Sequence, residues 1–191
     1  NTLSKLESLE KRTYVQSKSY DELTTLIKNK EALLASIPAI QPVSNKDLKR
    51  IASGFGYRID PVYKTTRFHA GLDFTAETGT PVYATGDGVV EIAGPMGDGY
   101  GNKVVINHGY GYHTLYGHNS KVLVHVGEKV KRGQTIALVG STGKSTGPHC
   151  HYEVWKNSSK IDPVNYFFND LSPEQYEQML KIAEQGNQSF D

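Results

Sequence analysis

Residues 145–155 read Ser-Thr-Gly-Pro-His-Cys-His-Tyr-Glu-Val-Trp, a polar turn followed by a run of β-forming residues. The run His149–Trp155 is the last of six short runs of this type, and glycine-rich turns separate them. The other five are Pro81–Ala84, Gly88–Ala93, Lys103–His108, Tyr112–Tyr116 and Thr135–Val139. No helix of ordinary length fits between these runs, so the pattern predicts a mainly β fold built on an antiparallel sheet.

A long helix is predicted at the start of the chain, over residues 3–37. Seven of the ten heptad positions between Leu6 and Ile37 are apolar or aromatic, a narrow stripe that is typical of a coiled coil. Pro38 and Pro42 end the helix, because the residue before a proline is pushed out of the α region. A lone helix of this kind is marginal, so we expect it to pack against the next domain, a second copy of the chain, a protein partner or an upstream segment.

The predicted organisation has four parts, namely a coiled-coil-like helix over residues 1–38, a linker over 39–52, a β domain over 53–170, and a short helix with a tail over 171–191. The linker carries the charged run Lys46–Arg50, which we interpret as solvated surface. Ser172 as N-cap, Pro173 at the first helical position and Gln175 in a capping box predict the C-terminal helix. Because the sequence begins inside the heptad pattern, we expect it to be part of a longer protein.

The composition argues against several classes of function. Lys and Arg total 21 and Asp and Glu total 20, so the net charge of +1 gives no global field to recruit nucleic acid or a lipid surface. No stretch reaches the roughly 20 apolar residues of a membrane span, and the first residues show no signal-peptide pattern. The single cysteine, Cys150, excludes a disulfide framework within the chain and a zinc site built from several cysteines.

Two motifs stand out among the seven histidines, His69-Ala-Gly-Leu-Asp73 and His149-Cys-His151. On a strand, the period of two places the imidazoles of His149 and His151 on one face and points Cys150 into the core as a small hydrophobe. Two imidazoles and one carboxylate are a donor set of catalytic zinc sites, which keep a fourth position open. Hydrogen-bonded core histidines are the alternative, but both motifs lie beside glycine-rich loops, which favours a metal site.

Three other histidines are predicted to have no functional role. His108 lies at a strand end, where we expect a hydrogen bond to the backbone, and His125 lies in a Val-His-Val run at the surface. His113 precedes His118 by five residues, so strand alternation places it on the opposite face.

Several motifs follow one another in the order of a known family. They are Ser53-Gly-Phe-Gly-Tyr-Arg58, His69-Ala-Gly-Leu-Asp73, Gly79-Thr-Pro-Val-Tyr-Ala84, Tyr100-Gly-Asn102, Thr114-Leu-Tyr-Gly-His118, Val126-Gly-Glu-Lys-Val-Lys-Arg-Gly-Gln134 and Ser145-Thr-Gly-Pro-His-Cys-His-Tyr-Glu153. Through them, residues 53–168 resemble the lysostaphin-type (LytM-like) zinc metallopeptidases, cell-wall endopeptidases that cleave peptidoglycan cross-bridges or stem peptides. The resemblance implies an antiparallel β catalytic domain of the roll or sandwich type.

The resemblance also implies roles for individual residues. His69, Asp73 and His151 match the ligands of one zinc ion per chain. His149 and His118 match the two catalytic histidines, of which His118 is the better candidate for the general base. Tyr63, six residues before His69, matches on spacing alone a loop tyrosine that donates to the tetrahedral intermediate.

The implied function is hydrolysis of peptide bonds in peptidoglycan during cell-wall remodelling. A catalytically silent member of the family, which binds cell wall or activates an amidase, is the alternative, although the retained ligands and histidines favour an enzyme. The substrate implies a location in the cell envelope, periplasmic or extracellular, and an upstream membrane anchor fits the N-terminal helix. The bond that is cleaved stays open, with a preference for the Gram-negative type of cross-link.

Overall fold

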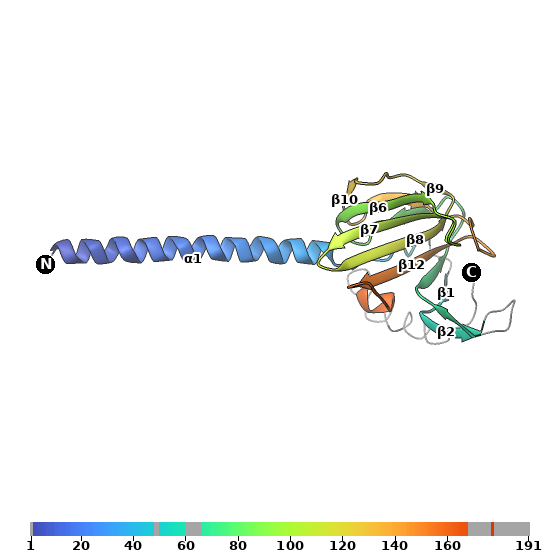
Figure 1. The fold of residues 1–191 in the computed structure, drawn as a ribbon, viewed down its shortest axis with the longest axis horizontal. Helices are drawn as coiled ribbons and strands as arrows, with labels where there is room; N and C mark the ends of the chain where they lie inside the picture. The colour runs from blue at the N-terminus through green and yellow to red at the C-terminus, as the bar shows by residue number, and fades with distance from the viewer. Residues whose placement is uncertain (1, 48–49, 60–65, 168–176, 178–191) are drawn as a thin grey trace. The chain divides into compact units, whose positions relative to one another are not determined.

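The computed structural model describes residues 2–47, 50–59, 66–167 and 177, and the chain forms two compact units, Asn1–Leu34 and Ala35–Asp191 (Figure 1). Helix α1 spans Thr2–Ser36, so it makes up the first unit and its last two residues belong to the second. The helix agrees with the predicted one to within a residue at each end. Its apolar stripe is not covered within this unit, since Leu6, Leu23 and Ile27 are 59%, 50% and 58% exposed. The coiled coil therefore stays a prediction.

Across the ranges that the structure describes, no helix combines the length and the apolar character required to cross a membrane.

The second unit is built from antiparallel sheets, which confirms the predicted fold class. The main sheet has eight strands in the order β1-β4-β12-β8-β7-β6-β10, with β13 paired to β12, and β6, β7, β8 and β12 lie side by side in Figure 1. A second sheet has the order β5-β11-β9, and β2 and β3 form a hairpin. The strands are β1 (Arg50–Ser53), β2 (Gly56–Ile59), β3 (Thr66–His69), β4 (Leu72–Thr75), β5 (Pro81–Tyr83), β6 (Gly88–Pro95), β7 (Asn102–Gly109), β8 (Tyr112–Asn119), β9 (Lys121–Val122), β10 (Lys129–Val130), β11 (Thr135–Leu138), β12 (His149–Lys156) and β13 (Ser159–Ile161), followed by the 3-10 turn η1 (Pro163–Tyr166).

All six predicted runs are strands, and the core lies between the main sheet and the smaller one. The apolar core includes Phe74 and Cys150 from the main sheet and Val82 and Ile136 from the smaller sheet, all 0% exposed. On β12 the core takes every second residue, so the intervening residues are available for another role.

The first part of the predicted linker over residues 39–52 is packed within the second unit, whereas Lys46 in its charged run is exposed, as expected. Ala39 and Val43 are 1% and 0% exposed, and Val43 belongs to the core. The carbonyl of Pro42 accepts a hydrogen bond from the backbone of Tyr83 at 2.8 Å, so this segment runs beside the smaller sheet. A proline has no N–H to donate, but its carbonyl can still accept at the edge of a sheet. Pro42 is therefore compatible with packing beside the smaller sheet.

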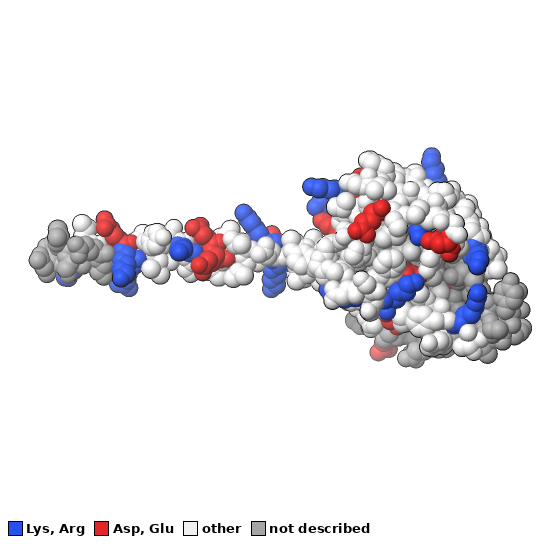
Figure 2. Space-filling model, in the orientation of Figure 1, with Lys and Arg blue, Asp and Glu red and all other residues white. Residues whose placement is uncertain are grey.

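Most of the predicted C-terminal helix and tail, over residues 171–191, lies outside the described residues. Figure 2 shows Lys and Arg side chains interspersed with Asp and Glu on the visible face of the β unit.

Candidate metal centre

Strands β3, β4 and β12 bring the two histidine motifs together. β4 and β12 are antiparallel neighbours, and Asp73 lies directly opposite His151. His69 ends β3, and Gly71 lies in the turn between β3 and β4. A Cβ atom at Gly71 would lie 2.2 Å from the carbonyl oxygen of Tyr152, so only glycine permits this approach to β12. The spacing His-Ala-Gly-Leu-Asp thus places an imidazole and a carboxylate beside His151.

The side chains of His69, Asp73 and His151 converge on one point. The Nε2 atom of His69 lies 3.1 Å from Oδ1 of Asp73 and 3.1 Å from Nδ1 of His151. That Nδ1 lies 3.0 Å from the same Oδ1, so the three atoms form a nearly equilateral triangle. All three residues are buried, at 3%, 0% and 1% exposure, and they form a group that could hold a metal ion.

Hydrogen bonds at the far side of each ring orient the two imidazoles. The carbonyl oxygen of Gly54 lies 2.7 Å from Nδ1 of His69, and Oε1 of Glu153 lies 3.1 Å from Nε2 of His151. Because these oxygens only accept, each neutral ring carries its hydrogen there and turns its lone pair towards Asp73. Two nitrogen lone pairs and a carboxylate oxygen then face one another, which is repulsive unless a positive charge lies among them.

The triangle fits a zinc ion. Zinc bonds nitrogen and oxygen at about 2.0–2.2 Å, and tetrahedral geometry then sets neighbouring ligand atoms roughly 3.3 Å apart. The distances of 3.0–3.1 Å between the three atoms are close to that value, and three protein ligands leave the fourth position open. Burial would raise the pKa of Asp73, but proton-bearing His69 and His151 beside it hold that pKa well below its ordinary value. The carboxylate is therefore ionised before a metal ion takes the place of those protons, as a ligand requires.

His118 and His149 also line the site. Nδ1 of His118 lies 2.8 Å from the carbonyl oxygen of Thr142, and Nδ1 of His149 lies 2.8 Å from that of Gly147. Both rings therefore carry a hydrogen on Nδ1, and Nε2 is the proton acceptor of the neutral form. The ring centroids of the two histidines are 4.7 Å apart, and Nε2 of His149 lies 3.8 Å from Oδ1 of Asp73.

A β-bulge turns His118 into this position. The register of β7 and β8 shifts between Asn102 and Val104, where β8 has one residue more than β7. The backbone of His118 has a φ of 61°, in the left-handed region that side-chain-bearing residues rarely occupy. Its N–H donates to the carbonyl of Tyr100 at 2.8 Å, which holds the bulge in place.

Because of the bulge, the predicted position of His113 is wrong. Strand alternation predicted that His113 and His118 lie on opposite faces, but His113 pairs with Trp155, on the face of β12 that carries His151. The two-residue period fails because Gly117 and His118 together stand opposite a single residue of β7. His113 itself contacts the carboxylate of Glu91 at 3.4 Å.

Three other residues that the sequence singled out, namely His108, His125 and Cys150, do not belong to the triangle. His108 is buried and hydrogen-bonds the backbone carbonyl of Asp87 at 2.8 Å, as expected from its position. The side chain of His125 is 82% exposed. Cys150 lies in the core, where burial raises the pKa of its thiol. Tyr63 lies outside the described residues.

Sequence reasoning assigned no role to Glu153, whose carboxylate contacts the ring of His151. It is 0% exposed and hydrogen-bonds His151, Tyr100 and Lys160. Burial would raise the pKa of Glu153, but these partners lower it to about 2. The same two-residue period that paired His149 with His151 extends to Glu153, so alternation along the strand was the available signal.

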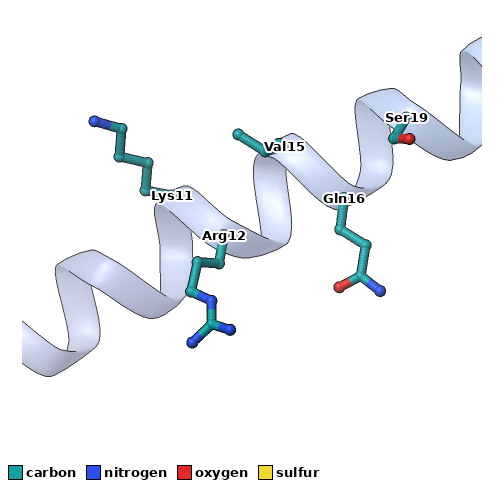
Figure 3. Close-up of a pocket in the computed structure, with 5 residues that line it drawn as sticks. All are labelled: Lys11, Arg12, Val15, Gln16 and Ser19. Atoms are coloured by element: carbon teal, nitrogen blue, oxygen red, sulfur yellow. The ribbon is translucent and has the colours of Figure 1, made fainter.

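A separate hollow lies on the surface of α1. Figure 3 shows its lining residues, which are Lys11, Arg12, Val15, Gln16 and Ser19. Lys11 and Val15 point to one side of the helix in this view, and Arg12 and Gln16 point to the other. These groups do not converge on a common point, so the hollow is not a candidate for chemistry.

Three known proteins show what this chain is similar to. The DD-carboxypeptidase/endopeptidase Mpg of Neisseria meningitidis is 49% identical over 116 residues, which cover 61% of this chain and 26% of that protein. The crystal structure of a zinc-containing peptidase from Vibrio cholerae has 44% identity and a TM-score of 0.60, and covers 64% of this chain and 37% of that one. Lysostaphin from Staphylococcus simulans has 36% identity and a TM-score of 0.53, over 63% of this chain and 50% of that one.

The chain spans about a quarter of the length of the Neisseria relative. Residues 67–163, which are 97 of the 191, match the model of peptidase family M23. That segment contains both histidine motifs and His118, so it includes every side chain of the site described above. The resemblance found in the sequence is confirmed: the chain belongs to peptidase family M23.

Proposed function

We propose that this chain is a zinc-dependent endopeptidase that hydrolyses peptide bonds of peptidoglycan during cell-wall remodelling. The observation that carries the proposal is the triangle of His69, Asp73 and His151, whose two lone pairs and carboxylate face one another within 3.1 Å. The family and the names of the relatives support the same activity.

His69, Asp73 and His151 would hold one zinc ion per chain. When bound, zinc supplies a Lewis acid that polarises a peptide carbonyl and makes water a better nucleophile near neutral pH. The residues themselves contribute an ionised carboxylate and two oriented imidazoles, leaving a net positive charge at the centre. Their burial strengthens this charge because little solvent screens it.

His118 is our candidate for the general base. Its Nδ1–H donates to Thr142, which fixes the ring and leaves Nε2 to take a proton from the attacking water and return it to the leaving amine. The Nδ1–H of His149 likewise donates to the carbonyl of Gly147, and the ring lies beside Asp73. Its Nε2 can therefore accept from a water and orient it, and in a protonated ring the same atom would donate to the developing oxyanion. Tyr63 is proposed as a further donor on its spacing alone.

The proposed catalytic domain covers residues 53–170, after a helix over 1–38 and a connecting segment over 39–52. A peptidoglycan substrate implies an envelope location, periplasmic or extracellular, and the names of the cell-wall relatives support it. The names of relatives called DD-endopeptidases favour a cross-link of the DD type. We also propose that α1, with its exposed apolar stripe, mediates self-association or holds a protein partner.

The experiment that tests this function is digestion of defined muropeptides by the zinc-loaded chain, with mass spectrometry of the products. We expect one cleaved peptide bond, loss of cleavage with a chelator, and recovery when zinc is added back. A His118→Ala variant that keeps zinc is the matched control for contaminating hydrolases. Intact muropeptides after incubation with a fully zinc-loaded protein would contradict the proposal and favour the catalytically silent alternative.

A further inference from the structure

Glu153 lies two residues beyond His151 on β12, on the same face of the strand. Its carboxylate is fully buried and receives four hydrogen bonds. The donors are Nε2 of His151 at 3.1 Å, the hydroxyl of Tyr100 at 2.6 Å and Nζ of Lys160 at 3.1 Å, all to Oε1, and Nε1 of Trp155 at 2.6 Å to Oε2. A carboxylate held by four donors in one place is a rigid acceptor.

This acceptor determines which nitrogen of His151 can bind a metal. Glu153 can only accept, so the hydrogen of the neutral ring is on Nε2 and the lone pair is on Nδ1. Nδ1 is the atom that lies 3.1 Å from Nε2 of His69 and 3.0 Å from Oδ1 of Asp73. If the hydrogen moved to Nδ1, the triangle would lose one of its three ligand atoms.

Packing fixes the plane of the same ring. The ring of Tyr100 lies 5.4 Å from the ring of His151, centroid to centroid. A Cβ atom at Gly117 would lie 3.3 Å from the Tyr100 ring and 3.4 Å from Cβ of His151, so the glycine leaves just enough room for both. The ring of Tyr100, tilted by 45° to that of His151, thus packs beside it while the Tyr100 hydroxyl donates to the carboxylate of Glu153.

We propose that Glu153, held by Tyr100, is a positioning residue that fixes the tautomer and orientation of His151 and so strengthens metal binding. The inference rests on the proposed metal site. Glu153 acts through His151, and its two oxygens are already occupied by the four donors. Carboxylates that accept from the second nitrogen of a metal-binding histidine commonly contribute 10- to 100-fold to metal affinity.

The test compares zinc affinity in Glu153→Gln and wild-type protein, measured by competition with a chromophoric chelator. The amide keeps the size of the side chain but removes its charge and half of its accepting capacity. We expect zinc to bind about 10- to 100-fold more weakly. At saturating zinc, activity should return to within a few-fold of wild type, whereas a general folding defect would not be rescued by metal.

Glu91→Gln is the matched control. Glu91 is also a glutamate that contacts a histidine on the main sheet, with its carboxylate 3.4 Å from Nε2 of His113. Neither residue belongs to the triangle, so this variant should bind zinc within about twofold of wild type. Equal affinities of Glu153→Gln and wild type would overturn the inference.

A spectroscopic measurement on wild-type protein covers the case in which Glu153→Gln does not fold. Long-range ¹H–¹⁵N spectra of the zinc-loaded chain should show the proton of His151 on Nε2. A proton on Nδ1 would also overturn the inference. If wild-type protein binds no zinc at all, the proposed function fails instead, so the two failures are distinguishable.

Discussion

Two buried polar clusters lie on opposite sides of strand β12, which contributes His151 to one and Tyr152 to the other, and they are built differently. The cluster on the outer face consists of His69, Asp73 and His151, where three lone-pair atoms converge within 3.1 Å. The cluster on the core face is a chain of hydrogen bonds that runs through His108, Thr114, Tyr116, Thr85 and Tyr152.

The core-face chain can satisfy itself. Its links measure 2.7 Å, 3.0 Å, 2.9 Å and 2.9 Å, and most of its members are hydroxyls, which donate and accept at once. The outer triangle differs, because Gly54 and Glu153 accept from the far side of the two rings, so a proton or a metal ion has to lie between the three atoms that face one another. Burial alone therefore does not mark a functional site. What marks it is a set of acceptors whose arrangement requires a cation.

The largest expected effect is the loss of metal in His151→Ala. Removal of one of three ligands should weaken zinc binding by far more than the 10- to 100-fold that a supporting residue contributes, and peptidase activity should fall to background. Metal analysis after dialysis and a muropeptide assay check both outcomes.

Cys150→Ala is the matched control for that variant, because Cys150 is adjacent in the chain but points into the core. It should bind a full equivalent of zinc and lose about 1 kcal/mol of unfolding free energy, the cost of a small cavity. A full equivalent of zinc in His151→Ala would show that the ligand assignment is wrong.

His118→Ala should separate turnover from metal binding. His118 contacts the ring of His149 but is not part of the triangle, so zinc should stay bound. Loss of a general base typically costs 10²- to 10⁴-fold in rate, and we expect kcat to fall by about that much. Single-turnover kinetics on a defined muropeptide, with zinc measured on the same sample, checks both quantities. A variant that keeps its kcat would remove His118 from the mechanism.

The alternation of residues along the strands made much of this site predictable from the sequence. The run His149–Trp155 predicted a strand, and the period of two predicted both the shared face of His149 and His151 and the burial of Cys150. The structure agrees on each point. The meeting of Asp73 with His151 was implied only by the family resemblance, because strand order is set by contacts between distant segments.

Other features followed no local pattern. The bulge at His118 adds one residue to a strand and reverses the alternation, and Gly117-His118 gives no sign of it in the sequence. Residues 39–43 follow Pro38 and contain Pro42, and we predicted them to be part of a linker, yet Val43 lies in the core and the carbonyl of Pro42 accepts from the backbone of Tyr83. In both cases tertiary contacts override what the local sequence favours.

The pH dependence of stability tests the core-face cluster through His108. Burial, the largest cause, lowers the pKa of His108 from 6.5 to about 4, and the hydrogen bond to Asp87 opposes it only in part. Between these two pH values the unfolded chain binds a proton that the folded chain does not, so stability is lost as the pH falls from 6.5 to 4. The loss should be about 3 kcal/mol, at 1.36 kcal/mol per pKa unit.

Because other groups titrate in the same range, the measured quantity is the difference between wild type and His108→Gln in urea unfolding at each pH. That difference should shrink as the pH falls. A constant difference from pH 7 to pH 4 would mean that His108 titrates normally in the folded protein.

Tyr152→Phe is expected to have the smallest effect, and it tests whether the two faces act independently. Tyr152 follows His151 directly, but its hydroxyl bonds Thr85 on the core face at 2.9 Å. Thr85 keeps Tyr116 as a partner, also at 2.9 Å, so the loss should be about 1 kcal/mol of unfolding free energy with zinc affinity unchanged. Denaturant unfolding and the chelator competition measure the two. Zinc binding weakened tenfold or more would show that the core-face chain supports the metal ligands through β12, and the separation of the two clusters would then be wrong.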